Sequence, residues 1–198
     1  MSDIYKTIAT SGEGLVREKM SRFLSFAIPV KDAEEAKARI KEYQNKYHDS
    51  RHVCWAYMLG PDRSIWQLND NGEPSGTAGK PILGQINSYE LTDILIVVVR
   101  YFGGIKLGTS GLIAAYRSAA KEAIDNAEIV ERHDMGSITV RFPYLAMNDV
   151  MRALKRSEAQ ILDQQFDNNC EITLAIRRDH LDALAKALLD IDGTTLAD

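Results

Sequence analysis

Two glycine-rich stretches carry the residue types that could bind an anion. The first, RYFGGIKLGTSGL (100–112), places four glycines between a run of β-branched residues and an alanine-rich segment. A helix start leaves about four backbone N–H groups unpaired and carries partial positive charge, and glycines let a ligand approach the backbone closely. Anion binding is therefore available at this turn, with Arg100 and Lys106 as nearby cations and Thr109 or Ser110 as helix caps.

The second stretch, NDNGEPSGTAGKP (69–81), is a polar insert of thirteen residues. Structureless segments of this length are uncommon inside compact domains and are often functional. Its hydroxyl groups, N–H groups and lysine could hold a phosphate or a peptide backbone, and a rigid surface loop ending in a helix N-cap is the alternative. The residues that we predict to contact RNA, phosphate or a partner are Asp70, Glu73, Ser75, Gly76, Thr77, Gly79, Lys80, Arg100, Tyr101, Gly103, Gly104, Lys106, Gly108, Thr109 and Ser110.

The specific nucleotide-binding motifs are incomplete in both stretches. Gly103 to Gly108 has the glycine spacing of a P-loop, but Thr109 stands where the phosphate-binding lysine belongs. The sequence GTAGK resembles the end of a P-loop, but Pro81 replaces the hydroxyl residue that would hold magnesium. We therefore do not predict nucleotide hydrolysis, and glycines that only shape tight turns are the alternative to anion contact.

A catalytic site would need a nucleophile or base with a perturbed pKa, and His52, Cys54 and Asp70 are the candidates. His52 and Cys54 face the same way on a predicted strand, but neighbours on one strand face rarely reach hydrogen-bond geometry. Asp70 and Glu73 could pair as carboxylates or bind magnesium, and exposed turn residues explain them as well. Arg100 could instead be the buried structural partner of either carboxylate. We predict no catalytic residue, no metal site and no cofactor.

The bulk composition is that of an ordinary globular protein. The 198 residues are 45% hydrophobic and 26% charged, and no apolar stretch approaches the ~18 residues of a membrane helix. The N-terminal MSDIYKTIAT lacks the basic start and apolar middle of a signal peptide, and two cysteines are too few for a disulfide framework. These features favour a reduced, cytoplasmic protein without a membrane partner.

The charge offers no global attraction to nucleic acid, because the net charge is −4. It is uneven, however: within residues 51–121, seven basic residues stand against five acidic ones. This mild excess is compatible with an anionic partner. A protein partner that makes no use of the anion-binding groups is the alternative.

Hydrophobic periodicity predicts an α+β architecture. In the first part of the chain, strands are predicted at 14–19, 22–29, 52–59, 65–68 and 91–101, with helices after Asp32 and from about Ser110. The segment EIVERHDMG (128–136) is predicted to be a connector. After it come a strand (137–143), a helix (147–154), two strands (160–166 and 171–177), a helix (181–188) and a short strand (194–197). This β-α-β-β-α-β order is ferredoxin-like, so we predict two domains, 1–130 and 131–198.

Several motifs of the first domain resemble the Impact/YigZ family. In that family an apolar strand leads into an arginine, two aromatics, paired glycines, two variable residues, an aliphatic residue and a glycine. Here Arg100, Tyr101, Phe102, Gly103, Gly104, Leu107 and Gly108 fill these places. The segments EKMSRFLSFAIPV, RHVCWAYMLG and DNGEPSGTAGKPIL also look like family segments, so the match covers roughly residues 12–127.

The resemblance implies a fold and a biological setting. For residues 1–130 it implies the fold of the second domain of small-subunit ribosomal protein five, which also occurs in elongation factor G. Residues 131–198 look like the elongation-factor-G-like C-terminal domain of bacterial members. The implied function is a non-enzymatic regulator of translation that contacts RNA, the ribosome or a translation factor through the glycine-rich loops. The alternative is a small hydrolase-type enzyme acting on a phosphorylated or acyl substrate in the same cleft.

Overall fold

The computed structural model describes residues 3–167 and 169–197, which divide into two compact units. One unit spans Ile4–Arg132, and the other comprises the chain from His133 onward together with Asp3. Each unit packs helices on an antiparallel sheet, which confirms the predicted α+β class. None of the helices in the described ranges combines the length and hydropathy that crossing a bilayer requires.

A five-stranded antiparallel sheet forms the centre of the first unit. Its order is β2 (Gly12–Glu18), β3 (Ser21–Pro29), β6 (Ile94–Tyr101), β4 (His52–Leu59) and β5 (Ile65–Asn69). Strand β6 is central, as its apolar run predicts, because both of its faces are buried. Val97 and Val99 pack into the hydrophobic cluster on one side of the sheet, and Ile96 and Val98 pack into the cluster on the other.

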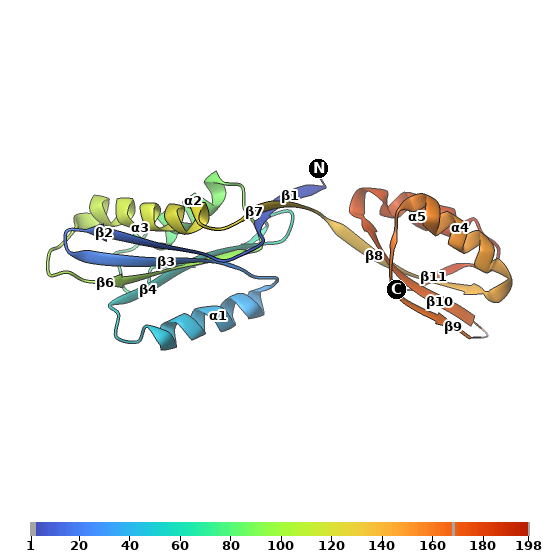
Figure 1. The fold of residues 1–198 in the computed structure, drawn as a ribbon, viewed down its shortest axis with the longest axis horizontal. Helices are drawn as coiled ribbons and strands as arrows, with labels where there is room; N and C mark the ends of the chain where they lie inside the picture. The colour runs from blue at the N-terminus through green and yellow to red at the C-terminus, as the bar shows by residue number, and fades with distance from the viewer. Residues whose placement is uncertain (1–2, 168, 198) are drawn as a thin grey trace. The chain divides into compact units, whose positions relative to one another are not determined.

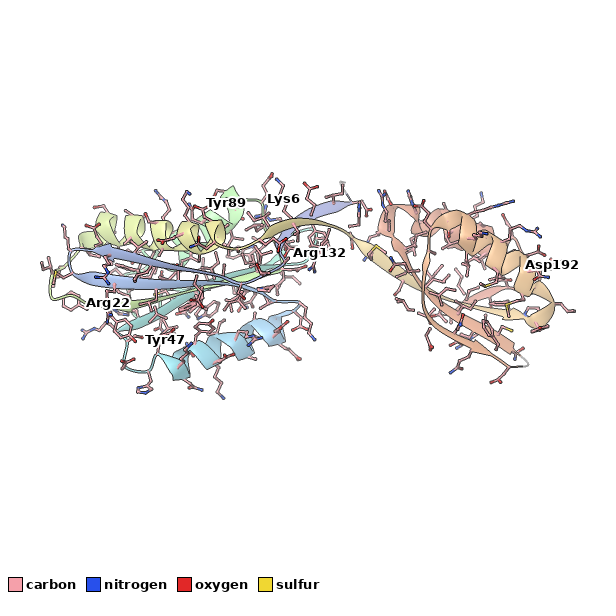
Figure 2. The ribbon with its side chains drawn as sticks, viewed as in Figure 1. Lys6, Arg22, Tyr47, Tyr89, Arg132 and Asp192 are labelled. Atoms are coloured by element: carbon pink, nitrogen blue, oxygen red, sulfur yellow. The ribbon has the colours of Figure 1, made fainter. Side chains whose placement is uncertain are left out.

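Helices cover both faces of this sheet (Figure 1). The helix α1 (Ala33–Lys46) lies on one face, while α2 (Gly79–Ser88) and α3 (Gly108–Asp125) lie on the other. Helix α1 begins at Asp32 as predicted, because the Asp32 carboxylate accepts a hydrogen bond from the Glu35 amide at 2.8 Å. Tyr47, which follows α1, lies on the α1 side of the sheet (Figure 2).

Helix α3 packs closely on the sheet because its inner stripe is largely alanine. The buried residues of this stripe are Leu112, Ala115, Tyr116, Ala119, Ala120, Ala123 and Ile124. A Cβ atom added at Gly12 of β2 would lie 2.1 Å from the Ala123 carbonyl oxygen. The bare backbone of β2 is therefore what lets α3 approach this edge of the sheet.

Three elements of the first unit depart from the sequence expectations. Helix α2 lies where the polar insert ends; no helix range was predicted there, since Pro81 and two glycines interrupt its short apolar pattern, but it fits the alternative of a rigid loop that ends in a helix N-cap. Strand β7 (Ile129–His133) replaces part of the predicted connector and pairs with β1 (Ile4–Ile8), which was not predicted either. Both strands are only five residues long, and their sequences, IYKTI and IVERH, carry little alternation.

The second unit has the predicted β-α-β-β-α-β order. Its elements are β8 (Met135–Pro143), α4 (Met147–Ser157), β9 (Gln160–Phe166), β10 (Asn169–Arg177), α5 (Arg178–Leu189) and β11 (Thr195–Ala197), with a 3-10 turn at Tyr144–Ala146. The sheet is antiparallel in the order β11-β8-β10-β9. Its core is the apolar cluster that includes Val140 and Ile172 of the sheet, Val150 of α4 and Leu184 of α5.

Candidate functional site

The polar insert is built around the carboxylate of Asp70. Oδ2 accepts a hydrogen bond from the Gly76 amide at 2.8 Å, and Oδ1 accepts from the amides of Ala78 (3.0 Å) and Gly79 (2.8 Å). Burial alone raises the pKa of Asp70, but these three amides and the charge of Lys80 outweigh it and hold the pKa below its usual value. The amides that open α2 are therefore already satisfied by an anion that the chain itself supplies.

Other groups of the same insert also bond within the chain. The Thr77 hydroxyl is buried and donates to the Pro74 carbonyl at 2.6 Å. The Asn71 side chain accepts from the Val53 amide at 2.7 Å, and the Asn71 carbonyl lies 2.7 Å from His52 Nδ1. The insert is thus fastened to β4, and of its predicted contact residues only Ser75 and Lys80 have exposed side chains free of such bonds in the described part of the chain.

Glu73 is the centre of a buried polar network. Its Oε1 accepts hydrogen bonds from Arg100 Nη1 and from the Tyr116 hydroxyl, each at 2.7 Å. The Glu73 side chain is 3% exposed and that of Arg100 is 6% exposed. Of the alternatives for Arg100, the structure therefore shows the buried ion pair with Glu73. His52 completes the cluster, with Nε2 at 3.7 Å from Glu73 Oε2.

Strand pairing places these groups together. Arg100 lies opposite Phe23 on β3 and opposite His52 on β4, so the three side chains share one face of the sheet. The guanidinium carbon of Arg100 lies 5.5 Å from the ring centroids of both Phe23 and Phe102. The arginine is thus held by aromatic faces as well as by its carboxylate partner.

Cys54 is part of this cluster but cannot serve as a nucleophile at neutral pH. Its sulfur is fully buried, 3.0 Å from the Asp70 carbonyl oxygen and 3.3 Å from the Tyr116 hydroxyl. Burial raises the pKa of the Cys54 thiol to about 12. Since only the thiolate attacks, burial and the raised pKa both argue against the Cys54 version of the hydrolase hypothesis. His52 does not assist Cys54 either, because its Nδ1 faces the Asn71 carbonyl.

Asp70 and Glu73, suggested as paired carboxylates or magnesium ligands, bind different partners in the structure. Asp70 accepts from amides through both of its oxygens, and Glu73 accepts from Arg100 and Tyr116 through Oε1, with His52 Nε2 3.7 Å from Oε2. Among the residues that the structure describes, no three His, Cys, Asp or Glu side chains converge in a way that could hold a metal ion.

A cavity of about 460 Å³ opens beside the Glu73–Arg100 pair, where α3 begins. We call it the α3 cavity. Its lining includes the side chains of Arg51, His52, Arg100, Phe102 and Lys106 and the chain at Gly108 and Thr109. The first glycine-rich stretch (100–112) and the insert therefore meet at one cavity.

The N-terminus of α3 differs from those of α1 and α2 in having no cap from the chain. Asp32 accepts from an amide of the first turn of α1, and Asp70 from the first amides of α2. At α3, no side chain of the described residues accepts from the opening amides. Thr109 and Ser110, suggested as caps, are exposed and make no such bond. This helix start consequently keeps its unpaired N–H groups and its partial positive charge.

Three basic groups surround this helix start. Arg51 and Lys106 are exposed, and neither forms an ion pair or a side-chain hydrogen bond with any residue that the structure describes. Arg100 is buried, and its Nε has no hydrogen-bond partner in the described ranges. This Nε atom is closed to solvent, so a ligand in the cavity does not reach it directly, and the accessible positive charges at this cavity are those of Arg51 and Lys106.

The remaining predicted residues shape the turn or lie elsewhere. Tyr101 belongs to the α1 face of the sheet, where its hydroxyl bonds to Asp49 at 2.9 Å and its ring lies 5.0 Å from the Arg22 guanidinium. A Cβ at Gly103 would lie 2.1 Å from the backbone of Met20, so glycine is required there by close approach. Gly104 and Gly108 have positive φ angles (88° and 72°) and form the turn before α3.

Two residues of the site, Arg51 and Tyr116, are absent from the sequence prediction. Arg51 directly precedes β4, and its amide donates to the Arg100 carbonyl at 3.1 Å. Antiparallel pairing of the predicted strands 52–59 and 91–101 would have placed Arg51 and His52 beside Arg100. Tyr116 reads in the sequence only as one member of an apolar helix stripe, and nothing in that pattern signals its hydrogen bond to Glu73.

The second unit also contains a cavity, of about 620 Å³, on the side of α4 and α5. Its lining carries charges of both signs, and two of them, Asp149 and Arg152, already pair at 3.3 Å. The acidic and basic residues of this lining balance, whereas Arg51 and Lys106 at the α3 cavity have no carboxylate partner among the described residues.

Fold and site together define a two-unit α+β protein with a basic cavity beside a buried glutamate–arginine pair. A family model described as the Impact N-terminal domain matches residues 19–124, and the chain belongs to the IMPACT family. It is similar to the IMPACT family member YvyE of Bacillus subtilis, with 31% identity over 187 residues that cover 94% of this chain and 86% of that protein. It is also similar to the IMPACT family member YigZ of Escherichia coli, with 33% identity over 150 residues that cover 75% and 74% of the two chains.

The fold has a counterpart among solved structures. A crystal structure of a hypothetical protein matches with a TM-score of 0.75 and 28% identity, covering 99% of this chain and 97% of the other. The family resemblance that the sequence motifs suggest is confirmed by the family model and the two relatives.

Proposed function

We propose that the protein is a non-enzymatic RNA-binding protein that acts in translation, and that its RNA contact is the α3 cavity. The observation that carries the proposal is the meeting of two features at one cavity: an uncapped helix N-terminus and the two unpaired cations Arg51 and Lys106. Phosphate oxygens of RNA are acceptors that such donors bind. The setting in translation rests on the fold that the family resemblance implies.

The charges at the cavity suit a phosphate group. Glu73 neutralises Arg100, so Arg100 adds little net charge. The net attraction would come from Arg51 and Lys106, together with the helix start, which is equivalent to about half a positive charge. Phe102, 45% exposed at the same cavity, offers an aromatic face on which a base next to that phosphate would stack.

The hydrolase alternative receives less support from the same residues. The thiol of Cys54 is buried and neutral, as described above. His52 is the remaining base at the cavity, with Nδ1 2.7 Å from the Asn71 carbonyl and Nε2 3.7 Å from Glu73 Oε2. The nucleophile that it would have to activate, Cys54, is buried and hydrogen-bonded to Asp70 and Tyr116. We therefore propose binding without catalysis.

The test is an equilibrium titration of fluorescently labelled single-stranded RNA, read by anisotropy, with wild type and Arg51→Ala/Lys106→Ala. Both side chains are exposed, so the variant should fold normally. We expect this variant to bind RNA roughly tenfold more weakly, because each lost phosphate contact reduces by about 0.7 the number of counterions that binding releases. The same loss should lower the slope of log K against log salt.

The matched control is Lys37→Ala/Lys41→Ala, which removes the same charge from exposed positions of α1 on the opposite face of the sheet. Its affinity should equal that of wild type. Failure of the wild type to bind RNA, or equal weakening by both double variants, would contradict the proposal. Ribosome co-sedimentation tests the setting: wild type should sediment with ribosomes and Arg51→Ala/Lys106→Ala should not, and a wild type that stays in the supernatant would contradict a role at the ribosome.

A further inference from the structure

A second cavity of about 350 Å³ lies beside α2 and α3, and we call it the α2–α3 cavity. Its lining includes Gly76, Lys80, Gly84, Gln85, Ile113 and Arg117. It borders the same insert as the α3 cavity, because Glu73 and Pro74 line the one while Gly76 and Lys80 line the other. Helix α3 likewise contributes its first residues to the α3 cavity and the next turns to the α2–α3 cavity. The two cavities are therefore neighbours that both border the insert and α3.

The α2–α3 cavity has its own unpaired cations. Lys80 and Arg117 are exposed, and neither makes an ion pair or a hydrogen bond with another described residue. The nearby carboxylate of Asp70 is engaged by three amides. One turn further along α3, by contrast, Lys121 pairs with Asp125 at 2.5 Å. The unpaired positive charges of α2 and α3, Lys80 and Arg117, thus both line the α2–α3 cavity.

The backbone around the α2–α3 cavity is accessible to a bulky ligand. A Cβ atom added at Gly84 would meet nothing within 4 Å, so the surface of α2 is bare at this point. Gly76 adopts a φ of 78° and exposes the tip of the insert beside Lys80. A sugar–phosphate backbone could therefore pass close to the main chain here.

We propose that the α2–α3 cavity is a second phosphate subsite, so that the ligand is a single RNA strand whose backbone runs from the α3 cavity across the insert to Lys80 and Arg117. The inference rests on the proposed function and specifies the ligand of that site. Two recessed subsites suit a flexible strand, and the exposed ring of Phe102 at the α3 cavity can stack only on a base that is not paired in a duplex.

The experiment compares wild type, Lys80→Ala/Arg117→Ala and the control Lys37→Ala/Lys41→Ala with 5′-phosphorylated oligouridylates of increasing length. For wild type, affinity should rise as the strand becomes long enough to reach the α2–α3 cavity. Lys80→Ala/Arg117→Ala should bind a dinucleotide as wild type does but an octanucleotide roughly tenfold more weakly. Its salt slope with the octanucleotide should be smaller by about 0.7, the contribution of one phosphate.

Each outcome separates the two proposals. An octanucleotide bound equally tightly by wild type and Lys80→Ala/Arg117→Ala overturns the second subsite, while RNA binding that still depends on Arg51 and Lys106 leaves the proposed function standing. Absence of RNA binding by wild type overturns both. A blunt RNA duplex that binds as tightly as the single strand overturns the strand inference. A polyglutamate peptide that binds as tightly, with the same dependence on Lys80 and Arg117, assigns the surface to an acidic protein instead.

Discussion

Replacing Glu73 by glutamine should destabilise the first unit, because it leaves the charge of Arg100 buried without its counter-ion. The two side chains are only 3% and 6% exposed, and Glu73 Oε1 accepts from both Arg100 and the Tyr116 hydroxyl at 2.7 Å. Glutamine has nearly the same shape, so packing is preserved and the change isolates the charge. The prediction therefore concerns the ion pair and not a cavity.

The expected loss is about 3 kcal/mol. Removing one partner of a buried ion pair destabilises proteins by about 3–5 kcal/mol, and the lower value applies because the glutamine oxygen can still accept from Arg100 and Tyr116. For a unit of this size, each kcal/mol lowers Tm by about 4 °C, so Tm should fall by about 12 °C. An exposed pair sets the scale for comparison. Glu42→Gln, which breaks an ion pair with Arg39 whose side chains are 57% and 46% exposed, should cost less than about 1 kcal/mol.

The assay is urea unfolding followed by tryptophan fluorescence. Both tryptophans of the chain, Trp55 and Trp66, lie in the first unit, so the signal reports that unit alone. Arg100→Gln and the double variant Glu73→Gln/Arg100→Gln complete a double-mutant cycle. The double variant should be more stable than the sum of the single losses predicts, since neither charge is then buried alone. A loss for Glu73→Gln no larger than that of Glu42→Gln, with no coupling to Arg100, would refute the buried pair.

Three further predictions follow from single residues. Cys54 and Cys170 are both buried, so neither should react with a thiol reagent in the native protein at neutral pH, whereas both should react in urea. Rapid labelling of Cys54 in the native protein would restore the nucleophile hypothesis. Asp70→Asn should cost about 1–2 kcal/mol at pH 7. The pKa of Asp70 is depressed in the folded protein, so its contribution to stability is complete above the unfolded pKa of about 3.9 and is lost as the pH falls through the folded pKa. The stability difference between Asp70→Asn and wild type should therefore shrink in acid. A difference that stays constant with pH would contradict the cap. Gly103→Ala should destabilise strongly, because its Cβ would lie 2.1 Å from the backbone of Met20. Gly84→Ala should instead stabilise by roughly 0.5–1 kcal/mol, because its Cβ would meet nothing within 4 Å and alanine favours the helix. Urea titrations that rank the two variants the other way would contradict the packing described.

Most of the fold could be predicted from local pattern because its elements are strongly periodic. The run from Ile94 to Val99 marked the central strand, and the alternation of β8 and β10 with the intervening helices marked the second unit. Helix α2 escaped prediction because Gly79, Pro81 and Gly84 are poor helix formers, and packing of Ile82 and Ile86 into the core stabilises it nonetheless.

The candidate site could be predicted only in outline, because its decisive contacts are distant in the sequence. Glycine spacing identified both loops, and the structure brings them to one cavity. Whether the amides of a loop are free to bind a ligand depends on which side chains fold back onto them. The Asp70 carboxylate accepts a hydrogen bond from the amide of Gly79, nine residues further along the chain. The bonds of Glu73 to Arg100 and Tyr116 span 27 and 43 residues. No local pattern distinguishes an arginine that will meet such a partner from one that stays free for a ligand.

The proposal that the uncapped start of α3 receives a phosphate can be tested most directly by nuclear magnetic resonance. The measurement is a titration of ¹⁵N-labelled protein with a 5′-phosphorylated uridine dinucleotide, followed through backbone amide shifts. We expect the largest changes at Gly108, Thr109 and Ser110, since these amides would bond to the phosphate, and none along α1. Amides at the start of α3 that do not move while the dinucleotide shifts residues elsewhere, or moves nothing at all, would contradict phosphate binding at this helix.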